Sequence, residues 1–124
     1  MEAVAALSFT GTSELAEVAL EPLGVRPTAT EGEPAESIRR LHEDAGGEFG
    51  VWECQPGRFP TAKDGVSELM HVISGHARVH GSDGSLHELR AGDTFLAPDG
   101  WSGEWELLEP TRKLYVLWKT RSAE

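Results

Sequence analysis

The stretch SELMHVISGHARVHGSDGSLHEL, residues 67–89, and its continuation TFLAPDGWSGEWEL, residues 94–107, decide the fold. Short apolar runs are separated here by turn signals such as SDG and PDG, at intervals of roughly eight to twelve residues. Residues 101–107 have a period of two, in which Trp101, Trp105 and Leu107 alternate with polar side chains. The pattern predicts short antiparallel strands whose tryptophans face inward.

The same pattern extends outward from this stretch, from residue 36 to residue 119. The predicted strands are SIRRLHE, EFGVWECQ, SELMHVIS, HARVHG, SLHEL, TFLAP, WSGEWELLE and RKLYVLWK, and the segment PGRFP is interpreted as a turn. About eight short strands without a long helix predict an all-β jelly-roll barrel over residues 35–121. Residues 1–34 are turn-rich and polar, and we expect an N-terminal arm in which TSELAEVAL forms a short helix or a strand.

Composition limits the classes of partner. The chain has 124 residues, 39% of them hydrophobic, which is enough for one domain with its own core. Its formal charge of −10 argues against nucleic acids and anionic membranes, which attract clustered Lys and Arg. The single Cys54 excludes an internal disulfide, and no run of about eighteen apolar residues occurs. We therefore expect a cytoplasmic protein.

Residues 57–103 resemble the two motifs of the cupin superfamily, whose barrels usually hold a divalent metal. Gly57, Glu68 and Gly75 match the first glycine, the glutamate and the last glycine of the first motif. The histidine pair between them is absent, because the intervening stretch reads RFPTAKDGVS. GDTFLAPDGWSG matches the second motif except at its histidine, where this chain has Gly103. Of the usual ligands only Glu68 remains, so we expect no metal cofactor.

A narrower resemblance is carried by GVWECQPGRF, GDTFLAPDGWSGEWE and PTRKLYVLW. These segments are similar to the ureidoglycine-aminohydrolase-type cupin family, which includes cupins of ethanolamine utilisation. The resemblance implies a cupin-type double-stranded β-helix that forms a homodimer and binds metal only optionally. The enzyme of that name binds metal through histidines that this chain lacks, so its activity is not carried over.

Glu68 is the candidate catalytic residue. It shares a strand face with Met70 and Val72, so all three side chains point inward if the apolar pair does. A carboxyl group among apolar neighbours has a raised pKa and can act as a general acid or base. The alternative is a structural ion pair of Glu68 with Arg58 or Arg112.

Four further residues are candidates for ligand binding together with Met70. Trp101 and Trp105 flank Gly103, where the absent histidine leaves a gap between two indoles that suits a flat or sugar-like ligand. The alternative is that the rings fill the barrel, an interpretation we favour for Trp105 and not for Trp101. Trp52 lines the same cavity or a dimer face, and Arg58 binds a ligand carboxylate or lies exposed on the surface.

The histidines do not form a metal motif. His76 and His80 alternate with Ala77 and Val79, so we expect the histidines in solvent, with His87 beside His80 across the hairpin. His71 has the opposite parity to Glu68, and His42 lies on a separate strand. Cys54 has no histidine in its strand to activate it, which favours a buried, unreactive thiol.

Three hypotheses for function follow. The first is a homodimeric cupin that binds a small molecule. The second is a lyase, isomerase or hydrolase that acts on a small polar metabolite through Glu68, with or without a divalent metal held by oxygens such as those of Asp64. The third is a structural module whose barrel is filled by its own side chains.

Overall fold

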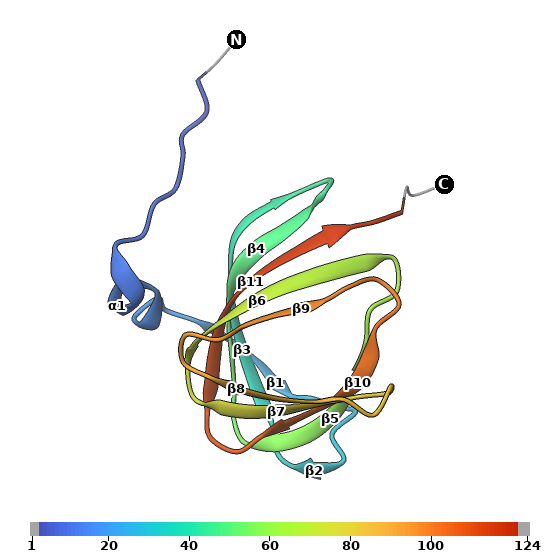
Figure 1. The fold of residues 1–124 in the computed structure, drawn as a ribbon. Helices are drawn as coiled ribbons and strands as arrows, with labels where there is room; N and C mark the ends of the chain where they lie inside the picture. Colours follow the sequence, from blue (N-terminus) through green and yellow to red (C-terminus); the bar gives the residue numbers. More distant parts are fainter. Residues whose placement is uncertain (1–2, 122–124) are drawn as a thin grey trace.

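A computed structural model describes residues 3–121, which form two antiparallel β-sheets packed face to face as a jelly roll (Figure 1). The six-stranded sheet has the order β1-β3-β4-β11-β6-β9, and the five-stranded sheet has the order β2-β5-β10-β7-β8. The elements are α1 (Gly11–Ala16), β1 (Glu21–Val25), β2 (Glu31–Gly32), β3 (Ala35–Asp44), β4 (Gly47–Cys54), β5 (Gly57–Ala62), β6 (Val66–Ser74), β7 (His76–Gly81), β8 (Leu86–Arg90), β9 (Thr94–Ala97), β10 (Ser102–Leu107) and β11 (Thr111–Lys119).

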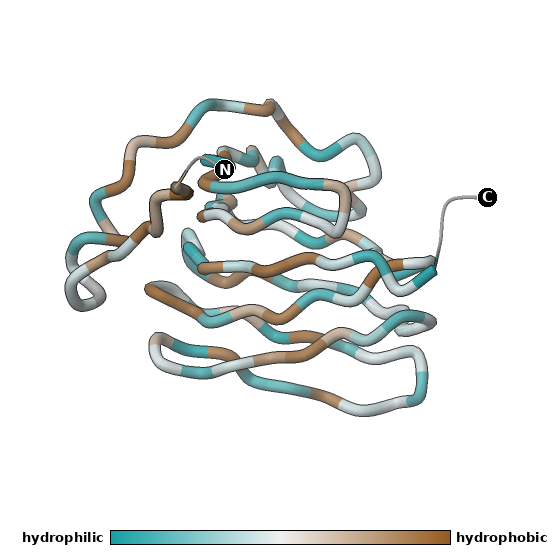
Figure 2. The backbone as a smooth tube through the Cα atoms, turned by 90° about the horizontal axis from the view of Figure 1, so that it is seen from above, coloured by the Kyte–Doolittle hydropathy of each residue, from teal (hydrophilic) through white to brown (hydrophobic). Residues whose placement is uncertain are grey.

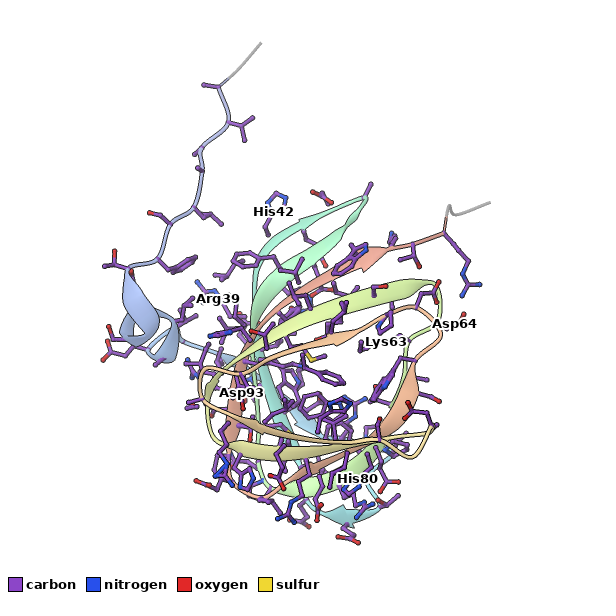
Figure 3. The ribbon with its side chains drawn as sticks, in the orientation of Figure 1. Arg39, His42, Lys63, Asp64, His80 and Asp93 are labelled. Atoms are coloured by element: carbon purple, nitrogen blue, oxygen red, sulfur yellow. The ribbon has the colours of Figure 1, made fainter. Side chains whose placement is uncertain are left out.

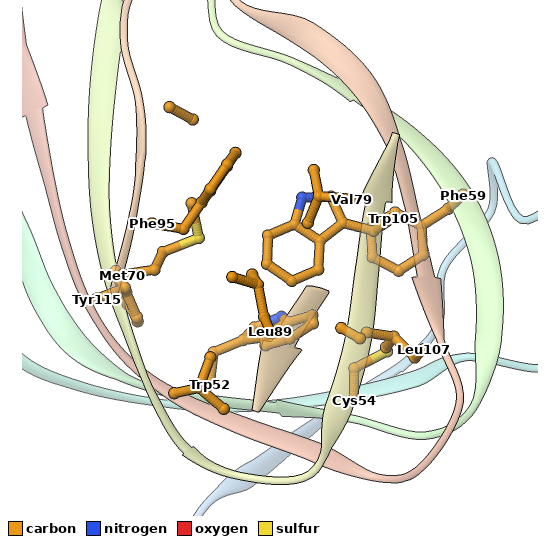
Figure 4. Packing of buried hydrophobic residues seen from close by; sticks show 13 residues of the cluster. Trp52, Cys54, Phe59, Met70, Val79, Leu89, Phe95, Trp105, Leu107 and Tyr115 are labelled. Atoms are coloured by element: carbon orange, nitrogen blue, oxygen red, sulfur yellow. The ribbon is translucent and has the colours of Figure 1, made fainter. Parts of the chain in front are cut away.

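The core lies between the sheets and follows the predicted alternation (Figure 4). Met70 and Val72 of β6, Val79 of β7, and Trp105 of β10 are all at most 4% exposed. Figure 2 shows the corresponding change between hydrophobic and hydrophilic positions along the strands. The all-β jelly-roll prediction is confirmed.

One predicted turn is a strand. Residues 57–60 of PGRFP belong to β5, which pairs with β10 over its whole length and with the short β2 only at Gly57 and Arg58. Phe59 is 3% exposed and lies opposite Trp105, so its burial draws this segment into the sheet. Beyond Arg58 the strand is an edge, where Pro60 removes no ladder hydrogen bond.

The N-terminal segment contributes to both sheets. The structure pairs β1 with β3 and β2 with β5, so two short strands of the predicted arm form sheet edges. The helix α1 begins one residue before TSELAEVAL and ends at Ala16 within it. Arg112 of β11 fixes the end of this helix by donating hydrogen bonds to the carbonyl oxygens of Leu15 and Val18. Among residues 3–121, no helix has the length and apolar character needed to span a bilayer.

Gly75 permits the sharp connection from β6 in one sheet to β7 in the other. Its φ is +103°, a region that L side chains rarely adopt. A Cβ atom at this position would also lie 2.6 Å from Cα of Thr111 and collide with the carbonyl oxygen of Pro110. The backbone that follows β10 therefore packs directly on Gly75, which explains why the motif requires glycine here.

We predict that Gly75→Ala lowers the free energy of unfolding by roughly 2–4 kcal/mol, because it adds a steric collision to an unfavourable φ. Gly84→Ala is the matched control, since Gly84 has a φ of +91° with nothing within 4 Å of its Cβ position. The control should cost about 1 kcal/mol. Urea denaturation followed by circular dichroism measures both, and equal losses would contradict the proposed close approach.

Candidate functional site

A cavity of about 200 Å³ lies between the two sheets. Both sheets contribute to its walls, together with the segment that precedes β2 and the residue that follows β5. Its lining consists of Arg26, Ile38, Arg40, Glu48, Trp52, Phe59, Thr61, Lys63, Glu68, Met70, Trp105, Lys113, Tyr115 and Leu117. The cavity is thus polar and charged as well as aromatic.

Three charged side chains meet in this cavity and form what we call the Lys–Glu–Lys triad: Lys63, Glu68 and Lys113. Nζ of Lys63 lies 2.6 Å from Oε1 of Glu68, and Nζ of Lys113 lies 3.0 Å from Oε2. The side chains of Lys63, Glu68 and Lys113 are only 14%, 7% and 10% exposed. Each carboxylate oxygen therefore has its own ammonium partner away from bulk water.

Lys113 is held among aromatic rings by the strand that carries it. Its Nζ lies 4.4 Å from the ring centroid of Trp52 and 5.0 Å from that of Trp105, and it donates to Sδ of Met70 at 3.2 Å. Burial lowers the pKa of Lys113, and the Glu68 carboxylate opposes that shift. The electron-rich ring faces further favour the cation.

The environment of Glu68 differs from the predicted one. Burial alone would raise the pKa of its carboxyl group, as expected, but the ammonium groups of Lys113 and Lys63 outweigh it and hold the pKa below its usual range. Glu68 is therefore ionised at neutral pH and poorly suited to act as a general acid. Glu68 does form ion pairs, as the alternative interpretation proposed, but its partners are lysines rather than Arg58 or Arg112.

Two further ion pairs flank the triad. Nη1 of Arg26 lies 3.0 Å from Oε2 of Glu36, which also accepts a hydrogen bond from Nε1 of Trp52 at 2.8 Å. The Arg26 guanidinium lies 4.2 Å from the centroid of the Phe59 ring. These contacts orient Trp52 with its ring face toward Lys113.

The second pair involves Arg40, whose side chain is 49% exposed, and Glu48. Nε of Arg40 lies 3.2 Å from Oε2 of Glu48, and this carboxylate also accepts a hydrogen bond from the Tyr115 hydroxyl at 2.7 Å. Burial, followed by the neighbouring Glu48, raises the pKa of Tyr115. The cavity therefore becomes more exposed toward Arg40, and the triad lies deeper.

Four of the six predicted site residues line the cavity: Trp52, Glu68, Met70 and Trp105. Trp101 does not line it. A Cβ atom at Gly103 would lie 2.7 Å from Cζ2 of Trp101, so this indole occupies the space that we expected to be a gap. Its ring packs against Phe95 with a centroid distance of 5.7 Å. The sequence favoured Trp101 as the pocket residue and Trp105 as a filler of the barrel. In the structure Trp105 lines the cavity and Trp101 fills space.

Arg58 and Asp64 lie outside the cavity. Arg58 pairs with Glu104 on the outer face of the five-stranded sheet. Asp64 has a 90% exposed side chain and pairs with Arg121, so the structure does not bring it together with the buried Glu68. Figure 3 shows Lys63 directed into the barrel, whereas Asp64 lies at its outer rim.

The histidines lie away from Glu68. His80 pairs with Glu106 on the outer sheet face, as expected, and Figure 3 shows it outside the barrel. His71 also faces outward and contacts Thr94. His87 was expected beside His80 but lies opposite Val79 and packs on Phe95, since it has the other parity.

The structure also shows which way Cys54 and the two aromatic residues of β11 face. Cys54 is fully buried, and burial raises the pKa of its thiol to about 12, which disfavours the nucleophilic thiolate. Tyr115 and Trp118 lie on opposite faces of β11. Tyr115 is the one that faces into the barrel, and Trp118 is 38% exposed on the outer face.

The residues present do not fit the divalent metal of the cupin motif. Both oxygens of Glu68 are bound by ammonium groups, and the Trp101 ring fills the space beside Gly103. Within residues 3–121 no three His, Cys, Asp or Glu side chains lie close enough together to hold an ion. The cations near the retained glutamate are lysine side chains.

The sequence reasoning missed both lysines of the triad. The signal for Lys113 was present, because Thr111, Lys113 and Tyr115 share one parity in β11 and the tyrosine faces inward. A lysine at an inward position requires a buried partner, and Glu68 was already expected inside. Lys63 lies in a loop just after β5, where strand parity gives no direction.

Comparison with known proteins gives the family. A family model described as "EutQ-like cupin domain" matches residues 41–115. No curated protein matches the chain. Many solved structures are similar, among them a protein of unknown function from Pseudomonas syringae pv. tomato, with a TM-score of 0.73 and 24% identity. That alignment covers 82% of this chain and 45% of the other, so this chain spans less than half of the Pseudomonas protein.

Two further structures have related titles. A putative ethanolamine utilization protein Q from Salmonella typhimurium has a TM-score of 0.61 and 23% identity, covering 70% of this chain and 72% of that one. A predicted oxalate decarboxylase from Thermotoga maritima has a TM-score of 0.65 and 18% identity, covering 85% and 96%. At these identities the likeness concerns the fold. Because the family model matches more than half of the chain, this protein belongs to the EutQ-like cupin domain family.

Proposed function

We propose that this protein binds a small polar metabolite in the cavity between its sheets. The observation that carries the proposal is the Lys–Glu–Lys triad beside open space and the rings of Trp52 and Trp105. Ligand sites combine apolar and aromatic walls with a few convergent polar groups in this way. A cavity of about 200 Å³ is smaller than the pockets that hold drug-sized ligands, which favours a compact metabolite.

An enzymatic role is the second candidate. Its support is the paired perturbation of Lys113 and Glu68, since shifted pKa values in a cavity are typical of acid–base sites. Here Glu68 would supply a fixed negative charge, and Lys113 would hold or release the proton. A lyase, isomerase or hydrolase reaction is compatible with these roles. The resemblance to the ureidoglycine-aminohydrolase type remains a prediction about family and carries no activity.

We further propose a homodimer formed through the outer face of the six-stranded sheet. Leu96, Leu69, Val116 and Phe49 are successive register partners across four strands, and the first three are 51%, 40% and 37% exposed. The segment before α1 extends away from the barrel in Figure 1, with Val4 94% exposed. A second copy related by two-fold symmetry would cover the apolar row and receive the arm.

We predict that a metabolite screen finds one ligand class that quenches tryptophan fluorescence, and that Trp105→Phe reduces this quenching. Trp118→Phe is the matched control, because Trp118 lies on the outer face and does not line the cavity. Quenching should persist in the control, since the cavity indoles remain. Quenching that is lost only with Trp118 would place binding elsewhere and contradict the proposal.

We predict that the purified protein contains far less than one divalent metal ion per chain. The reason is that Lys63 and Lys113 already occupy both oxygens of Glu68. Elemental analysis after dialysis without chelator measures this content directly. A stoichiometric metal would show that the triad rearranges, and it would move the enzymatic candidate ahead.

We predict that Leu69→Glu combined with Val116→Glu converts the dimer into a monomer, because charges on the apolar row would be buried unpaired. Light scattering after size-exclusion chromatography measures the mass. Leu86→Glu is the control, since Leu86 is 56% exposed on the other sheet. A monomeric wild-type protein at high concentration would refute the dimer.

A further inference from the structure

The charge of the cavity has the opposite sign to that of the whole chain. The formal net charge of the protein is −10. The cavity lining nevertheless contains four cationic side chains, Arg26, Arg40, Lys63 and Lys113, against two carboxylates, Glu48 and Glu68. An acidic protein that gathers cations inside its barrel creates a local positive potential there.

The pairing of these groups locates the excess charge. Arg26 is balanced by Glu36, and Arg40 by Glu48. With Lys63 and Lys113 both protonated, the Lys–Glu–Lys triad instead has two ammonium groups for one carboxylate, which leaves one positive charge without a counterion. Since the triad side chains are at most 14% exposed, this charge is poorly hydrated and favours an anion beside it.

The hydrogen-bonding capacity of the cavity has the same bias. The oxygens of Glu68 accept from the lysines, and Glu48 accepts from Tyr115 and pairs with Arg40. Donors remain, because each ammonium group has three N–H bonds. A complementary ligand must therefore supply acceptors.

We infer that the ligand is a small carboxylate that bears a single negative charge and a compact apolar or aromatic body. This inference rests on the proposed function and names its ligand class. The carboxylate neutralises the triad by lying beside Lys63, the more exposed of its two lysines, and the apolar body packs against the rings of Trp52 and Trp105. A single negative charge matches the single uncompensated positive charge.

The test compares acids with uncharged and cationic molecules of the same shape. Acetate, propionate and benzoate are titrated into the full chain at constant ionic strength, beside acetamide, propionamide, benzamide and benzylamine. Tryptophan fluorescence and isothermal titration calorimetry report binding. We expect at least one acid to bind saturably with one site per chain, and its amide to bind at least tenfold more weakly.

Charge variants give the sign of the effect. Lys63→Met leaves the remaining pair neutral and should weaken acid binding at least tenfold. Glu68→Gln raises the excess to two positive charges and should leave acid binding as tight or tighter. Lys119→Met, at the exposed end of β11, is the matched control and should change nothing. Circular dichroism checks that each variant is folded, and Lys63→Met decides the test if Glu68→Gln does not fold.

The outcomes separate the two proposals. Equal binding of benzoate and benzamide, or tighter binding of benzylamine, would overturn the anion inference and leave cavity binding intact. Unchanged acid affinity in Lys63→Met would also overturn it. If no probe binds the folded protein at millimolar concentration, the anion inference fails, whereas the proposed function fails only if the metabolite screen also finds no ligand.

Discussion

The site depends on one carboxylate that is shared by two ammonium groups inside a β-barrel. Glu68 and Lys113 come from neighbouring strands of the six-stranded sheet, whereas Lys63 follows directly on β5 of the other sheet. A buried charge without a partner costs several kcal/mol, roughly the scale of a whole domain's stability. The triad therefore constrains how the two sheets meet, and the aromatic rings around Lys113 complete its enclosure.

As in the cupin motif, a glutamate inside the barrel lies beside positive charge, but here ammonium groups supply that charge instead of a metal ion. The motif of the superfamily surrounds a metal with imidazoles and one glutamate. Here the glutamate remains, and primary amines supply the positive charge beside it. An ammonium group has no fixed coordination geometry and acts through hydrogen bonds, so a ligand that we propose for this site would be selected by its charge and the position of its acceptors.

The sequence predicted the fold better than the site. Alternation placed Glu68, Met70 and Trp105 correctly inside, because strand parity is a local property. It did not show that Trp101, which also packs inward against Phe95, fills the volume beside Gly103 instead of lining the cavity. It also read PGRFP as a turn, because the pairing partner that makes it a strand lies more than forty residues away in β10. Lys63 was missed for a similar reason, since only the assembled barrel shows where a loop side chain points.

The position of the Trp101 indole limits which substitutions could turn this barrel into a metal site during evolution. A histidine introduced at residue 103 would collide with this ring, and Glu68 would still be held by two lysines. Conversion to a metal site therefore requires several coordinated substitutions, each unfavourable without the others. These positions therefore depend on one another. A substitution at any one of them destabilises the interior unless the others change as well.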